Sequence, residues 1–191
     1  MKLLIAESLT PLIAEQGAAF EQRFEVLRGE HGSVNTRRHG LEAHDPAALI
    51  LSLKLCDPAM GSGHFLVTAV DYLADEVLEK IASAATHVNS ALPDWHYESP
   101  VAARIRDIRG RLLANAREGV WTLDENQLDD RHIVRRMILK RVIHGADKNP
   151  MAVELAKLSL WLQPSPSARR CRSSTTTFAA AMRCAANAWA R

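Results

Sequence analysis

The chain has 191 residues, of which 47% are hydrophobic and 24% charged, with a formal net charge of +2. This length suits one domain with a sizeable core, and the composition is that of an ordinary globular protein. No stretch approaches the roughly 18 consecutive apolar residues that a membrane span needs, and the N-terminus lacks a signal-peptide layout. Three cysteines without metal-ligand spacing fit a reducing compartment. We therefore expect a soluble, cytoplasmic protein with no membrane partner.

Positive charge is concentrated near the C-terminus. Residues 164–191 hold five arginines and no Lys, Asp or Glu, which leaves 19 of the 24 basic residues beside all 22 acidic ones. The body of the chain is therefore not predicted to be a basic nucleic-acid surface. Because residues 164–191 also lack Leu, Ile and Val, they can bury little apolar area, and we expect them to be disordered.

Residues 1–50 are predicted to form a helical segment. Apolar spacing indicates an amphipathic helix over Lys2–Arg28 that is interrupted or restarts near Pro11. Polar residues 29–40 read as a loop. Asp45 followed by Pro46 is typical of a helix start and predicts a short helix ending at Ile50.

Residues 51–163 alternate strand and helix patterns. Leu51–Cys56 is predicted to be a buried strand, a turn covers 58–63, and His64–His87 has the spacing of a long helix. An insertion is expected at about 88–130, with a helix over Ala103–Arg117. A helix near 130–140, a second strand over Arg141–Ala146 and a helix from 150 follow. Alternation of this kind predicts an α/β sheet.

A glycine-rich turn lies between the first predicted strand and the long helix, with the sequence DPAMGSGHF from Asp57 to Phe65. Its two glycines permit a tight turn and close approach of a ligand, and the first N–H groups of the helix are free to bind an anion. A dinucleotide fingerprint would need a small residue at Leu66, and a phosphate-binding loop would need Gly-Lys-Ser/Thr. The remaining alternative is a purely structural turn.

The segment DPAMGSGHFL resembles the S-adenosylmethionine-binding motif of adenine-specific DNA methyltransferases, especially the large restriction-modification and phage-defence type. GADKNPMAVELAKLSLWL, from Gly145 to Leu162, is similar to the same family's acidic second motif. The resemblance implies an incomplete Rossmann-like, doubly wound α/β domain of the class I methyltransferase type with a helical insertion. It covers about residues 3–163, and residues 51–163 would be the partial cofactor-binding domain.

The resemblance also implies a set of cofactor-binding residues. Asp57 would orient the methionine amino group, Gly61 and Gly63 would pass the cofactor with their backbones, and Phe65 would pack beside it. Asp147 would accept both ribose hydroxyls, although an ordinary strand-end cap is the alternative for this residue. The other members that the motifs place in the site are Pro58, Ala59 and Asn149.

The family's catalytic motif, Asn/Asp-Pro-Pro-Tyr/Phe, does not occur in this sequence, so no catalytic residue is predicted. No metal site is predicted either, since the cysteines lack metal-ligand spacing. The expected function is that of a fragment, inactive alone, of an enzyme that methylates the exocyclic amino group of adenine in DNA. Truncation, or a frameshift after about residue 163, would explain the missing motif. The alternatives are a non-catalytic subunit of a restriction-modification complex, paired with a second polypeptide, and another Rossmann-like cofactor-dependent enzyme.

Overall fold

The computed structural model of the protein describes residues 2–118 and 129–162. Within these ranges the chain forms seven α-helices, one short 3-10 helix and two strands. In chain order the elements are α1 (Lys2–Gly29), α2 (Val34–Glu42), α3 (Pro46–Ile50), β1 (Leu55–Asp57), α4 (His64–Ala91), η1 (Pro93–Trp95), α5 (Pro100–Glu118), α6 (Asp130–Arg141), β2 (Ile143–Gly145) and α7 (Pro150–Leu162).

The predicted Rossmann-like, doubly wound α/β fold is wrong. The described residues contain one sheet of two parallel strands, each three residues long, whereas a doubly wound fold needs a central sheet covered by helices on both faces. The first strand pairs only from Leu55, and the apolar residues before it, such as Leu51 and Leu53, pack into the helical core instead. The main hydrophobic contacts are therefore made between helices, and the two strands form a small connection at one end of them.

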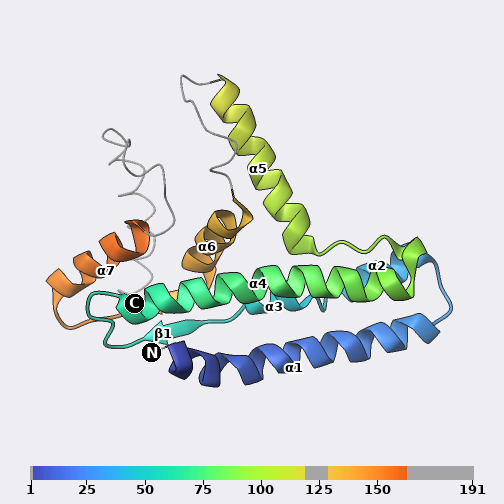
Figure 1. Ribbon diagram of the computed structural model, residues 1–191, viewed down its shortest axis with the longest axis horizontal. Coiled ribbons are helices and arrows are strands. Elements are labelled where there is room, and N and C mark those ends of the chain that lie inside the picture. The colour runs from blue at the N-terminus through green and yellow to red at the C-terminus, as the bar shows by residue number, and fades with distance from the viewer. Residues whose placement is uncertain (1, 119–128, 163–191) are drawn as a thin grey trace.

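Helix α4 is the element around which the others assemble, and it runs along the length of the molecule (Figure 1). It packs against α6, α3 and α1, and α5 projects away from this body (Figure 1). Its buried residues recur at helical spacing and comprise Leu66, Ala69, Val70, Leu73, Ala74, Val77, Ala84 and Val88. The predicted helix from His64 is thus confirmed, with an end at Ala91 rather than His87.

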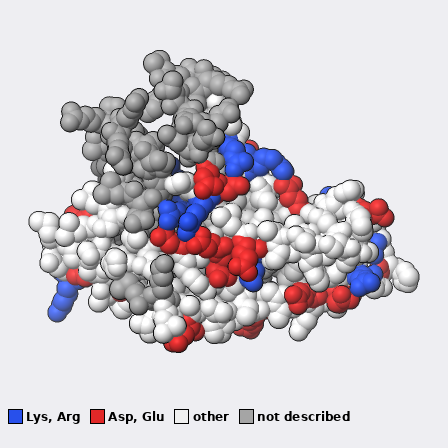
Figure 2. All heavy atoms as spheres, viewed as in Figure 1, with Lys and Arg blue, Asp and Glu red and all other residues white. Residues whose placement is uncertain are grey.

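Ion pairs connect α4, α6 and α5 at the edge of this core. Arg131 of α6 lies 2.8 Å from Asp75 of α4, and Arg135 pairs with Asp71, one turn further along α6 and one turn back along α4. Figure 2 shows acidic and basic side chains interleaved on the face that includes α4. These pairs bind α6 to α4 beside the apolar contacts of Val134 and Ile138.

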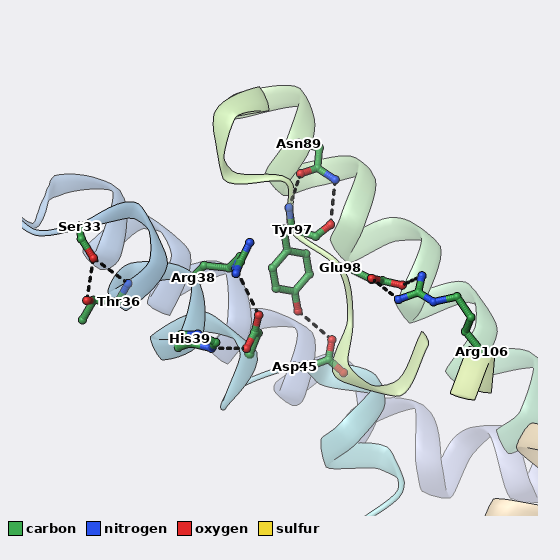
Figure 3. A network of polar contacts seen from close by, with 10 residues as sticks. Ser33, Thr36, Arg38, His39, Asp45, Asn89, Tyr97, Glu98 and Arg106 are labelled. Atoms are coloured by element: carbon green, nitrogen blue, oxygen red, sulfur yellow. Dashed lines mark hydrogen bonds and ion pairs between the residues drawn. The ribbon is translucent and has the colours of Figure 1, made fainter. Parts of the chain in front are cut away.

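A second, aromatic core lies at the other end of α4 and encloses a polar network. The buried Tyr97 hydroxyl donates to the buried Asp45 carboxylate at 2.8 Å, and the other oxygen of Asp45 caps α3 through Ala48 N–H at 2.8 Å. Figure 3 shows the Asn89 side chain bridging both backbone groups of Tyr97. Burial, together with the charge of Asp45, raises the pKa of Tyr97, so the phenol stays protonated.

The N-terminal predictions have mixed outcomes. Asp45 and Pro46 begin a helix that ends at Ile50, as expected. Helix α1 is continuous through Pro11, contrary to the predicted interruption, because apolar residues on both sides of the proline, such as Leu9 and Ile13, are buried in the same core. Tertiary burial offsets the roughly 3 kcal/mol that an internal proline costs.

The predicted loop at residues 29–40 is wrong over most of its length, because α2 begins at Val34. Ser33 caps this helix by accepting a hydrogen bond from Thr36 N–H at 3.2 Å. Leu41, on the same helix, is fully buried and anchors it in the aromatic core. A single buried leucine was too weak a periodic signal to predict the helix.

In the predicted insertion, α5 forms where a helix was expected, and residues 119–128 lie outside the described part; α6 forms the helix that was expected after the insertion. The expected disorder of residues 164–191 also falls outside the described residues. Among the helices that the structure describes, none combines the length and the apolar character needed to cross a membrane.

Candidate cofactor-binding site

The two strands bring together the motifs that the sequence singled out. They pair in parallel, with Leu55 opposite Ile143, Cys56 opposite His144 and Asp57 opposite Gly145. Because both strands end at the same edge, the loops that follow them emerge side by side. Asp57 and Asp147, 90 positions apart in the chain, therefore belong to adjacent strand ends.

Hydrogen bonds continue between the two loops beyond the paired residues. Ala146 N–H donates to the Asp57 carbonyl at 2.9 Å, and Met60 N–H donates to the Ala146 carbonyl at 3.0 Å. Gly61 N–H then donates to Asp147 Oδ2 at 2.9 Å. The glycine-rich loop after β1 is thus held by the loop after β2 through both backbone and side-chain acceptors.

The Asp147 carboxylate accepts one backbone hydrogen bond on each oxygen. Asn149 N–H donates to Oδ1 at 2.8 Å, and Gly61 N–H donates to Oδ2. These two bonds, from Asn149 first and then from Gly61, hold the pKa of Asp147 below its ordinary value. Each carboxylate oxygen retains a further acceptor position, so an ionised Asp147 can still accept hydroxyl donors from a ligand.

The two glycines of the loop have left-handed backbone conformations, with φ of +53° at Gly61 and +79° at Gly63. Gly63 also lies against α7, where an added Cβ would be only 3.0 Å from the Cβ of Ala156. Both its conformation and this close approach therefore require glycine. The Gly63 contact fixes the start of α4 against α7, the helix of the second motif.

The remaining predicted site residues have different environments. Pro58 and Ala59 are exposed on the loop, and Ala59 N–H donates to Asp57 Oδ1 at 3.0 Å. Phe65 is half-buried and packs against the main hydrophobic core. Asn149 is exposed and caps α7, because its side-chain oxygen accepts from Met151 N–H at 3.0 Å.

Two residues that shape the site, Gly145 and Met60, were not predicted to do so. An added Cβ at Gly145 would lie 2.3 Å from Met60 Sδ and 2.9 Å from Leu66 Cδ1, so the Met60 side chain lies directly over the end of β2. Glycine inside a strand often marks close approach of another group, and this signal at Gly145 could have indicated the contact. The identity of the contacting residue, Met60, was not readable from the sequence.

The arrangement combines a carboxylate, a glycine loop and the start of a helix. Gly63 provides no side-chain cap to α4, so the first N–H groups of this helix are not used by a capping side chain. Among residues 2–118 and 129–162, no group of His, Cys, Asp or Glu side chains has the arrangement of a metal site. The carboxylate, the loop and the helix start can bind a polar organic molecule through hydrogen bonds.

Comparisons with protein-family models, with curated proteins and with solved structures found no match to this chain.

Proposed function

We propose that the chain binds S-adenosylmethionine at the ends of β1 and β2, as the cofactor-binding part of an adenine-specific DNA methyltransferase. The observation that supports this most is the Gly61 to Asp147 hydrogen bond of 2.9 Å. It joins two motifs, each of which resembles one half of the family's cofactor site. The proposal concerns the ligand and the reaction, and it requires no sheet beyond the two strands described.

In this proposal, the loop provides the surface against which the cofactor lies. Asp57 is half-buried at the end of β1, where its carboxylate can meet the ammonium group of the methionine part. Asp147, a carboxylate at neutral pH, accepts the ribose hydroxyls on the acceptor positions that Gly61 and Asn149 leave unused. Gly61, with no side chain, allows the cofactor to approach the backbone between these two carboxylates.

The sulfonium cofactor would supply an electrophilic methyl group, and an adenine held beside it would be the acceptor. Base recognition in the family requires a Pro-Pro-Tyr-type segment that this sequence does not contain. We therefore propose that the chain binds the cofactor without transferring its methyl group, and that a second polypeptide bearing that segment would complete the activity.

Titration calorimetry of the full chain with S-adenosylmethionine tests the proposal. Binding is expected for the unmodified chain and a loss of about tenfold or more for Asp147→Asn, since one charge-assisted hydrogen bond contributes about 1.5–3 kcal/mol. Asp94→Asn, which removes an acid from η1, is the matched control and should bind normally. Binding of NAD in place of S-adenosylmethionine, or equal affinity in both variants, would contradict the proposal.

A further inference from the structure

Met60, in the middle of the glycine-rich loop, is held at three points. Its N–H donates to the Ala146 carbonyl at 3.0 Å, and its own carbonyl accepts from Gly63 N–H at 2.8 Å. Its Sδ lies in the space that a Cβ on Gly145 would need. The loop is thus attached at Met60 to the end of β2, to the loop that follows β2 and to the start of α4.

The backbone hydrogen bonds between the two loops do not by themselves determine which residues face each other. Every residue except proline offers the same backbone N–H and C=O, so a shifted ladder could form similar bonds. In sheets the register is set by where side chains can be buried. Gly145 is the only glycine among residues 141–149, so in this segment it alone leaves the space of a Cβ to Met60. The contact of Met60 with Gly145 therefore selects one register of the two loops.

This register places the next residue of the loop on the carboxylate of the candidate site. Gly61 N–H donates to Asp147 Oδ2 at 2.9 Å, and this bond follows the bond from Met60 to Ala146 by one position in each loop. Gly61 has no side chain to hold it there, and glycine can adopt many backbone conformations other than the observed φ of +53°. The position of the Gly61 N–H therefore depends on the attachment of its neighbour.

We infer that Met60 is a positioning residue of the candidate site, which holds Gly61 N–H against Asp147 and so fixes the direction of the carboxylate. It acts on a ligand through Asp147. An unbranched thioether side chain suits this task, because it fits irregular spaces in a core. Buried Leu66 closes the same space, since its Cδ1 lies 2.9 Å from the Cβ position of Gly145. The identity of the ligand rests on the proposed function, whereas the effect of Met60 on Asp147 does not.

The test follows the backbone amide signals of Gly61 and Asn149 by NMR as the pH falls, over the acid range in which the chain stays folded. Both amides donate to Asp147, so both signals should shift in the unmodified chain as this carboxylate takes up a proton. In Met60→Ala the Gly61 signal should lose most of this shift, whereas the Asn149 signal should keep it. Met60→Leu, which nearly conserves the volume, should restore the Gly61 response.

Two further variants separate positioning from a general loosening of the fold. Met137→Ala removes the same type of side chain from the buried side of α6, and should lower the unfolding midpoint without changing the Gly61 response. Met60→Val ends one atom short of the Sδ that lies against Gly145. It should reproduce the loss at Gly61 if Met60→Ala does not fold.

Calorimetry with S-adenosylmethionine on the same proteins should show about tenfold weaker binding in Met60→Ala and recovery in Met60→Leu, because Asp147 accepts charge-assisted hydrogen bonds from the ligand. A Gly61 signal that still follows Asp147 in Met60→Ala would overturn the inference. Equal losses in Met137→Ala, or full affinity in Met60→Ala, would overturn it too. Absence of binding in the unmodified chain would contradict the proposed function instead, and the amide signals would still decide the role of Met60.

Discussion

Asp45 and Asp147 each accept a backbone N–H and a second hydrogen bond, but the two carboxylates lie in opposite environments. Asp45 is fully buried in the aromatic half of the molecule, between Ala48 N–H and the Tyr97 hydroxyl. Asp147 is half-buried at the strand ends and, within the described part of the chain, is held by backbone N–H groups of its own and the neighbouring loop. The same side chain can stabilise a fold or remain available to a ligand, depending on whether solvent reaches its unused acceptor positions.

The largest effect should follow from breaking the buried member of this pair. Asp45→Ala removes the cap of α3, which costs about 1 kcal/mol, and leaves a buried Tyr97 hydroxyl without a partner, which costs about 1–3 kcal/mol more. Chemical denaturation should show a loss of about 3 kcal/mol in the free energy of unfolding.

Tyr97→Phe provides the control for this experiment. Combining it with Asp45→Ala should cost less than the sum of the two single changes, because the two residues interact directly. Strict additivity would show that the hydroxyl does not depend on Asp45. Any folded Asp45→Ala protein should retain its affinity for S-adenosylmethionine, since the strand ends are at the other end of α4.

A smaller effect is expected at the strand ends. Gly145→Ala would place a Cβ 2.3 Å from Met60 Sδ and should cost about 1–3 kcal/mol of unfolding free energy through overpacking. Met60→Ala in the same chain should recover part of this loss, because it removes the contacting side chain. Thermal unfolding of the single and double variants measures both effects, and no recovery in the double variant would mean that Leu66 or the backbone is responsible.

The smallest effect should be the pH dependence contributed by Asp147. Its pKa in the folded protein lies below the ordinary value of 3.8, so the unfolded chain takes up the proton first as the pH falls. The stabilisation is fully present above pH 3.8 and is lost as the pH falls through the lowered folded value. Denaturation curves of Asp147→Asn should lack this acid-dependent component, and identical pH profiles in both proteins would contradict the assignment.

The sequence predicted local features well where a residue type marks one structural feature, such as the start of a helix. Asp45 before Pro46, and Pro150 after Asn149, mark helix starts in the structure. The sequence also placed the glycine-rich turn and Asp147 directly after short strands, and the structure has both of them there, whereas the ligand of the two motifs stays a prediction. Their contact through Gly61 N–H and Asp147 could be expected only from the family resemblance.

The overall architecture was not predictable by the same reasoning. Two short apolar runs, 51–56 and 141–146, predicted strands of a larger sheet. In the structure, residues of the first run such as Leu51 and Leu53 join a helical core instead. Periodicity reports which residues are buried but not which element covers them. The contacts of Tyr97 with Asp45 and of Met60 with Gly145 depend on tertiary packing between segments that share no local pattern.

The pairing of Leu55 with Ile143 has a consequence for the order of folding, because these residues are 88 positions apart in the chain. Closing so long a segment costs entropy before any strand contact compensates for it, whereas helices form from local contacts. The strand ends should therefore assemble after α4 and α6 have docked. A molecule that binds at the strand ends would act on the last step of folding. Its presence during refolding should slow the separation of the two strands more than it speeds the formation of the helices.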